Sequence, residues 1–174
     1  MTEWVALLRG VNVGGITVRS ADLRDVLAGL GLTDVRTILA SGNATFTADD
    51  SRAHVKMRIE QALRDRFAYE AWVLVFRRDE LAAAAAAFPF DAGDDSRQPW
   101  VLFCTDTATR DELVAAAASL DADLDPVAGG PGVVYWNPAK GSSTDTPFAK
   151  LIAKRTYKER TTNRNLRTVL KILA

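Results

Sequence analysis

The fold begins with the stretch Trp-Val-Ala-Leu-Leu-Arg-Gly-Val-Asn-Val-Gly-Gly at residues 4–15. Its apolar first half predicts a β-strand over 4–9, which Gly10 stops. Three glycines then allow sharp changes of backbone direction, and an amphipathic helix follows between Ser20 and Gly31. The stretch therefore predicts a strand, a glycine-rich turn and a helix, with Arg9 and Asn12 placed at the turn.

The elements after this turn predict the fold class. We expect further strands at 35–40, 44–47 and 71–76, and a second helix that carries Val55, Ile59, Leu63 and Phe67. The order strand, helix, strand, strand, helix, strand is typical of a ferredoxin-like unit. The sequence thus predicts an α+β protein whose first subdomain spans residues 1–78.

The second half partly repeats this order without a repeat at the level of residues. An alanine-rich helix and a polar linker occupy 79–98, and an α+β subdomain is expected over 99–174. We expect strands at 100–104, 123–128 and 133–137, helices at 107–119 and 146–155, and a final amphipathic helix from about Asn163. The predicted architecture is therefore two ferredoxin-like subdomains with a C-terminal helix.

Composition limits the class of protein. The chain has 174 residues, of which 48% are hydrophobic and 25% charged, as in ordinary soluble domains. No stretch is long enough to span a membrane, the N-terminus does not resemble a secretion signal, and the single Cys104 cannot form an internal disulfide. We therefore expect a cytoplasmic protein with no membrane association. One histidine and one cysteine assemble neither a zinc site nor a catalytic triad by spacing, so no metal site is predicted and the catalytic residues are unknown.

Charge is unevenly distributed along a chain whose formal net charge is zero. Residues 140–174 contain nine Lys or Arg against Asp145 and Glu159, a net charge of +7, and the remaining 13 basic and 20 acidic residues give −7. Two interpretations stay open. The basic end could face an anionic partner, or its charges could form a solvated helix surface that is attracted to the acidic half.

The glycine-rich turn is the first candidate binding segment. Backbone N–H groups at Gly14 and Gly15, the side chain of Asn12 and the guanidinium of Arg9 could together hold a phosphate or carboxylate. The pattern is neither a Walker loop nor a Gly-x-Gly-x-x-Gly motif. The alternative is a strand-to-helix connection that needs glycine only for its backbone geometry.

Two further turns are rich in polar side chains. Ser41 and Asn43 flank Gly42 in a tight connection between two strands, and Thr162, Arg164 and Asn165 lie at the expected start of the last helix. Capping the last helix needs one such residue, so an anion site and a simple cap with solvated neighbours both stay open there. We predict that the three segments converge on a small anionic, phosphate-bearing ligand. Neither its identity, nor any cofactor, nor the oligomeric state follows from the sequence.

Three rival functions stay open. Nucleic acid could bind the basic segment 150–171, where Tyr157 among basic residues could stack on a base, although the aromatic strand signature of an RNA recognition motif is absent. An enzyme acting on a phosphorylated substrate would need a base, and no residue identifies itself as one. A structural or protein-binding role would depend on surfaces that sequence does not reveal.

Several motifs resemble the bacterial family of unknown function numbered 1697. They are Leu8-Arg9-Gly10-Val11-Asn12-Val13-Gly14-Gly15, Asp22-Leu23-Arg24, Val35-Arg36-Thr37, Ser41-Gly42-Asn43 and the ending Thr161-Thr162-Asn163-Arg164-Asn165. The likeness runs from the first strand to the last helix. It implies an α+β protein with ferredoxin-like subdomains and implies no activity.

Overall fold

The computed structural model describes residues 1–11 and 16–174, which form two compact units. The first unit contains residues 1–81 and 171–174, and the second contains residues 82–170. The elements, in chain order, are β1 (Thr2–Arg9), α1 (Ser20–Gly29), β2 (Thr33–Thr37), β3 (Asn43–Ala48), α2 (Arg52–Phe67), β4 (Trp72–Arg77), α3 (Arg78–Ala86), β5 (Trp100–Cys104), α4 (Thr107–Ala117), β6 (Val127–Gly130), β7 (Val133–Trp136), α5 (Pro147–Ile152), α6 (Arg155–Lys158), β8 (Thr161–Asn165) and α7 (Leu166–Leu173).

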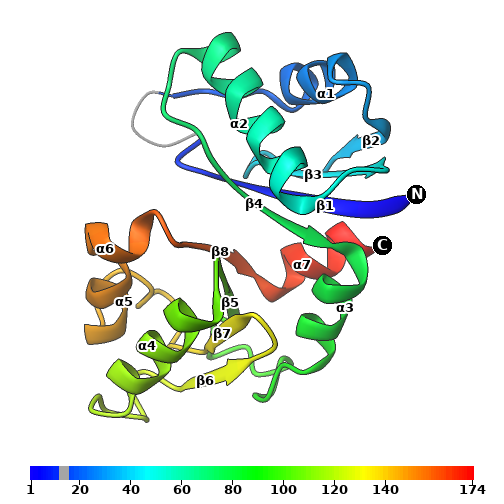
Figure 1. The fold of residues 1–174 in the computed structure, drawn as a ribbon. Helices are drawn as coiled ribbons and strands as arrows, with labels where there is room; N and C mark the ends of the chain where they lie inside the picture. The colour runs from blue at the N-terminus through cyan, green and yellow to red at the C-terminus, as the bar shows by residue number, and fades with distance from the viewer. Residues whose placement is uncertain (12–15) are drawn as a thin grey trace. The chain divides into compact units, whose positions relative to one another are not determined.

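The first unit is built on a four-stranded antiparallel sheet in the order β2-β3-β1-β4. Helices α1 and α2 lie on one face of this sheet (Figure 1). Side chains alternate across a strand, and Trp4, Ala6 and Leu8 of β1 point to the helical face. There they pack with Leu23 and Leu27 of α1, Val55, Ile59 and Leu63 of α2, and Phe46, Val73 and Val75 of the neighbouring strands. This apolar layer is the core that the periodicity predicts.

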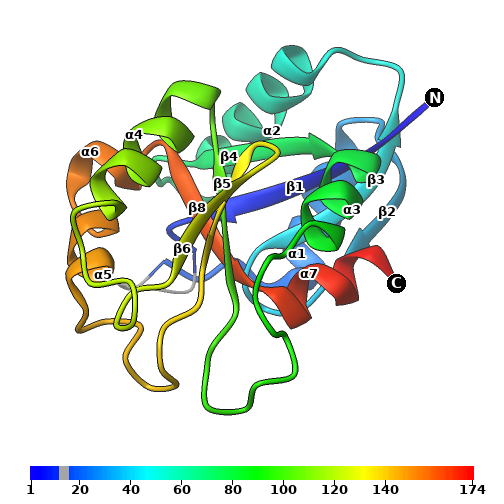
Figure 2. The ribbon, with the colours of Figure 1, turned by 90° about the horizontal axis from the view of Figure 1, so that it is seen from below.

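The second unit repeats the same topology. Its antiparallel sheet has the order β6-β7-β5-β8, so the strands of each unit occupy equivalent positions in the two sheets. Helices α4, α5 and α6 lie on one face of this sheet (Figure 2). Leu102, Trp136, Leu113 and Phe148 are among the residues that form its core. The prediction of an α+β protein with two ferredoxin-like subdomains and a C-terminal helix is confirmed.

The predicted start of the last helix is wrong. Residues 161–165 form strand β8, which pairs with β5, and α7 begins at Leu166. Polar residues such as Asn have low strand propensity, and their accumulation here resembles a helix cap. In the structure the two threonines and Arg164 are buried on an edge strand that completes the second sheet.

Smaller differences concern the ends of elements. The expected strand at 123–128 begins only at Val127, because Asp125 first closes a turn by donating its N–H to the carbonyl of Asp121. The expected helix at 146–155 is two helices, α5 and α6, because Lys154 has an extended backbone with ψ of 142°. Among residues 1–11 and 16–174, no helix is both long and apolar enough to cross a membrane.

Candidate functional site

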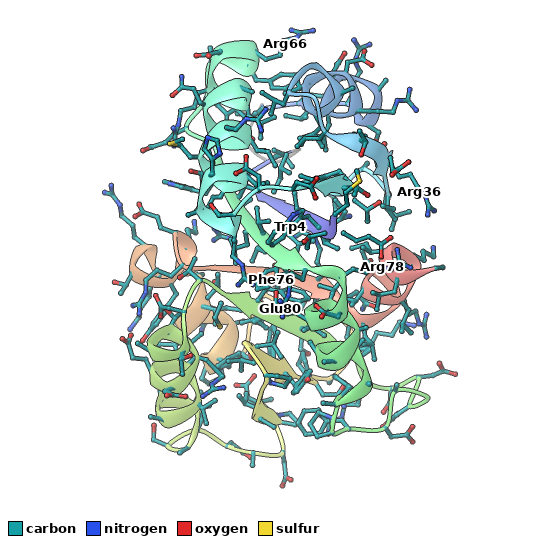
Figure 3. All side chains as sticks on the ribbon, turned by 45° about the vertical axis from the view of Figure 1, so that its right-hand side comes forward. Trp4, Arg36, Arg66, Phe76, Arg78 and Glu80 are labelled. Carbon is teal, nitrogen blue, oxygen red and sulfur yellow. The ribbon has the colours of Figure 1, made fainter. Side chains whose placement is uncertain are left out.

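The first sheet has a second face, opposite α1 and α2, and Arg9 belongs to it. In the register of β1 and β4, Val5 lies opposite Phe76 and Arg9 lies opposite Trp72. Opposed residues of an antiparallel pair point to the same side of the sheet. Figure 3 shows Trp4 on the side of α2 and Phe76 on the other side of the strands. Arg9 therefore extends from the end of β1 on the face opposite α1 and α2.

The charge of Arg9 is incompletely solvated and has no counter-charge among the described residues. Its side chain is half-buried, and burial lowers the pKa of its guanidinium. Within the described ranges 1–11 and 16–174, no residue forms a hydrogen bond or ion pair with the Arg9 guanidinium. Other half-buried arginines are satisfied, for example Arg58 by Asp50 and Arg110 by Asp111. Burying part of a cation costs free energy unless an anion or hydrogen-bond acceptor compensates.

The turn 41–43 lies at the same end of the sheet as Arg9. Asn43 is opposite Leu7 of β1, two residues from Arg9 on the same face. The fully buried Asn43 amide donates to the carbonyl of Ile38 at 2.8 Å and to the hydroxyl of Ser41 at 2.7 Å. The turn is thus held by its own side chains, which is a structural role for Asn43.

Two separate features of the turn require glycine at position 42. Its φ is +77°, a region that residues with a Cβ seldom adopt. An added Cβ would also lie 2.7 Å from Cγ2 of Val11 and 2.8 Å from Cβ of Leu8. The N–H of Leu8 donates to the Gly42 carbonyl at 2.8 Å, so the turn is fastened directly to the strand that carries Arg9.

Among the predicted site residues, Arg9 therefore lies at the same end of the first sheet as the turn 41–43. Arg9, Ser41 and Asn43 occupy one end of the first sheet. Asn12, Gly14 and Gly15 of the glycine-rich segment lie outside the described residues. Thr162, Arg164 and Asn165 belong to the second unit.

In the second unit, Arg164 is held within its own strand. It lies opposite Val101 of β5, and Thr162 lies opposite Phe103 on the same face. One guanidinium nitrogen, Nη1, donates to the hydroxyl of Thr162 at 2.7 Å and to the carbonyl of Asn163 at 2.9 Å. Arg164 is 7% exposed and Thr162 is 2% exposed. Both polar side chains are thus buried in the second sheet and hydrogen-bonded to each other.

Asn165 caps a helix, as its residue type predicts, but this helix begins at Leu166 and not near Asn163. Its side-chain oxygen accepts the N–H of Arg167 at 2.9 Å, at the start of α7. The carbonyl of Pro99 accepts the N–H of Leu166 at 2.9 Å. The polar ending is therefore divided between a buried strand and one helix cap.

Trp72 is a residue of this region that the sequence did not single out. A tryptophan next to Val73 and Leu74 in a strand predicts core packing, and Trp72 is only partly buried. It lies directly opposite Arg9 in the β1–β4 register. The end of the sheet therefore combines a cation with an aromatic ring. Strand alternation alone could have placed Trp72 on the face of Arg9.

Other reactive residue types have structural surroundings. Burial raises the pKa of the Cys104 thiol to about 12, which keeps it protonated and unreactive at neutral pH. His54 is exposed on α2 and pairs with Asp50 at 2.6 Å. In the part of the chain that the structure describes, no three His, Cys, Asp or Glu residues are grouped as metal ligands.

The basic side chains of the segment at α5 and α6 are exposed, but its aromatic residue, Tyr157, packs against the core. Lys150, Lys154 and Lys158 are exposed, and the side chain of Arg155 is 93% exposed and pairs with the Glu159 carboxylate at 3.7 Å. Tyr157 packs against the core of the second unit, and the Arg160 guanidinium lies 5.9 Å from its ring centroid. The segment therefore offers charge, and its tyrosine is partly buried against the second core.

Comparison with known proteins places this architecture in a family. A solved structure, that of the conserved bacterial protein SP0830 from Streptococcus pneumoniae, is similar with a TM-score of 0.80 and 28% sequence identity, over 99% of this chain and 97% of that chain. No curated protein matches the sequence. Residues 1–135 match the family model described as a protein of unknown function, DUF1697. The chain belongs to the DUF1697 family of proteins of unknown function.

Proposed function

We propose that this protein binds a small anionic, phosphate-bearing ligand at the end of the first sheet, with Arg9 as its main contact. The observation that carries the proposal is the half-buried Arg9 guanidinium, which has no acidic or hydrogen-bonding partner among the described residues. A guanidinium presents a planar set of donors that matches a phosphate or carboxylate with two parallel hydrogen bonds. Such a ligand would supply the missing counter-charge.

The position of Arg9 supports this role over an accidental surface charge. Partial burial strengthens an ion pair, because fewer water molecules screen it than at an exposed position. Arg36, on β2 of the same sheet, is exposed and extends away from the strands (Figure 3). A ligand anion would therefore gain more from Arg9 than from Arg36. The aromatic ring of Trp72 beside Arg9 favours a ligand with a planar group attached to the phosphate.

Thermal-shift measurements test the proposal with pyrophosphate, nucleotides and phosphosugars as probes. We expect at least one probe to raise the Tm of wild type and to leave the Tm of Arg9→Met unchanged. Without a probe, Arg9→Met should melt at the same temperature or higher, since it removes a partly desolvated charge. Arg36→Met is the matched control and should respond like wild type. Arg164→Met tests separately whether the second candidate cation contributes.

Equal shifts for wild type and Arg9→Met with every stabilising probe would contradict the proposed site. A lower melting temperature of ligand-free Arg9→Met would show instead that the guanidinium serves the fold.

Nucleic-acid binding is a second candidate, and the exposed charges of α5 and α6 favour it. Lys150, Lys154, Arg155 and Lys158 occur within nine residues, with Glu159 as the nearby acid. Binding through such charges weakens as salt rises, because counterions are released from the phosphates. We expect any RNA affinity to fall by about tenfold or more between roughly 50 and 200 mM salt, and to be lost in Lys150→Ala/Lys154→Ala/Lys158→Ala. Salt-independent RNA binding would exclude this candidate.

A further inference from the structure

The outer edge of β4 is covered by side chains of the helix α2. In the order β2-β3-β1-β4, β4 has a neighbouring strand on one side only. Its sequence, Trp-Val-Leu-Val-Phe-Arg, is strongly apolar. An edge strand presents backbone N–H and C=O groups that can pair with another chain, and an apolar edge is prone to such pairing. Whether the outward backbone N–H and C=O groups of β4 have hydrogen-bond partners therefore matters for solubility.

Glu60 and Lys56, one turn apart on α2, occupy both outward groups of Val73. The Val73 N–H donates to Oε1 of Glu60 at 3.0 Å, and Nζ of Lys56 donates to the Val73 carbonyl at 2.8 Å. Lys56 also donates to the same Glu60 oxygen. The ion pair thus supplies one acceptor and one donor, which are the groups that a neighbouring strand would supply.

Further side chains occupy the ends of the same edge. Outward positions alternate along a strand, so Val73, Val75 and Arg77 share this edge. Oε2 of Glu80 accepts the N–H of Arg77 at 2.8 Å. Because Val75 lies between two occupied positions, an incoming strand cannot form two consecutive outward pairs.

The opposite edge of the sheet is protected by its backbone geometry. The register of β2 with β3 shifts between Thr33 and Arg36, and Asp34 in this bulge has a φ of +52°. A bulge interrupts the regular row of backbone groups and disfavours pairing with a further strand. The regular β4 edge is therefore the one that needs side-chain protection.

We infer that the Lys56–Glu60 pair closes the β4 edge against strand addition by a second copy of this chain. The side chain of Glu60 is 12% exposed and that of Lys56 is 39% exposed, so the pair lies close against the strand. Removing the acceptor would free the Val73 N–H, and a second β4 could then pair with it.

Amide hydrogen exchange of Val73 tests the local part of the inference. Glu60→Gln keeps a carbonyl oxygen as acceptor, whereas Glu60→Leu keeps none. We expect Val73 to exchange about tenfold faster in Glu60→Leu than in wild type and at nearly the wild-type rate in Glu60→Gln. Equal exchange in all three proteins would overturn the inference, since the carboxylate would then not protect the edge.

Size-exclusion chromatography with light scattering tests association. Glu60→Leu should form larger species than wild type as concentration rises, while Glu60→Gln should keep the wild-type mass. Asp65→Leu is the matched control, because it adds an exposed leucine to α2 and breaks a similar i,i+4 contact, that from Gln61 at 2.9 Å. If Asp65→Leu associates as strongly as Glu60→Leu, general hydrophobicity explains the result and the inference fails.

A third variant keeps the test decisive if Glu60→Leu does not fold. Lys56→Met frees only the carbonyl of Val73 and leaves Glu60 on its N–H. We expect Lys56→Met to fold and to associate at concentrations at which wild type remains monodisperse. An unchanged mass for Lys56→Met, with Val73 exchanging in wild type as fast as an unprotected amide, would overturn the inference.

Discussion

Strands β4 and β8 occupy equivalent positions in the two sheets, yet their sequences have little in common. Each lies at the edge of an antiparallel sheet next to the first strand of its unit. β4 is built from Trp, Val, Leu and Phe, whereas β8 reads Thr-Thr-Asn-Arg-Asn. The same topological position is therefore filled by an apolar strand in one unit and by a polar strand in the other.

Both threonines of the polar strand have hydrogen-bond partners. Thr161 donates its hydroxyl to the carbonyl of Tyr157 at 2.9 Å, and Thr162 accepts from Arg164 at 2.7 Å. Threonine is β-branched and suits a strand, and the aliphatic part of arginine can pack on apolar neighbours. The comparison teaches that an edge strand needs backbone pairing and satisfied side chains more than it needs an apolar sequence.

The largest expected effect tests whether each sheet has a core of its own. Phe46 is 2% exposed in the first core, and Phe148 is fully buried in the second. Replacing a buried phenylalanine by alanine removes contacts and leaves a cavity, which costs about 3–5 kcal/mol. Phe46→Ala and Phe148→Ala should each lower the free energy of unfolding by this order in urea denaturation. A loss below about 1 kcal/mol for either one would show that its half has no separate core.

The next effect compares a turn from each unit. Gly42 and Gly132 both have positive φ, +77° and +72°, but only Gly42 has close neighbours. Gly132→Ala should cost about 1 kcal/mol from backbone strain alone. Gly42→Ala adds steric overlap with Val11 and Leu8 and should cost about 2–4 kcal/mol. Denaturation of the two variants measures the difference, and equal losses would contradict the close packing of turn 41–43 on β1.

A smaller effect separates the two roles of the polar ending. Asn165→Ala removes the cap of α7 and should cost about 1 kcal/mol without changing β8. Arg164→Met keeps the aliphatic bulk and leaves Thr162 without its donor, so we expect a similar or smaller loss. Circular dichroism melting checks both variants. If Asn165→Ala has no effect, its contact with the Arg167 N–H contributes nothing to the helix.

The smallest effect concerns the caps of α2 and α4. Ser51 caps α2 with a neutral hydroxyl, whereas Asp106 caps α4 with a carboxylate. Hydrogen bonds from the Thr109 N–H and hydroxyl lower the pKa of Asp106. Stability from a carboxylate with a lowered pKa is present above its unfolded value of about 4 and is lost as pH falls through the folded value. Asp106→Asn should therefore flatten the dependence of Tm on pH below about 4, while Ser51→Ala should lower Tm equally at each pH. Identical pH profiles for wild type and Asp106→Asn would contradict this.

The first sheet could be predicted from sequence because its strands alternate or are continuously apolar. Strand β8 could not, since its polar residues have low strand propensity and resemble a helix cap. Arg9 was predicted at the end of a strand, and the residue type alone indicated an anion contact. Its lack of a carboxylate partner among the described residues, and its position opposite Trp72, depend on register and tertiary structure.

The central claim is that Arg9 provides a partly buried positive charge for a ligand anion. NMR spectra of arginine side-chain N–H groups during a pyrophosphate titration test it most directly. We expect the Nε–H signal of Arg9 to shift saturably and to exchange more slowly with water, while that of Arg36 stays in place. An Arg9 signal that does not move, or that moves no more than the signal of Arg36, would contradict the account.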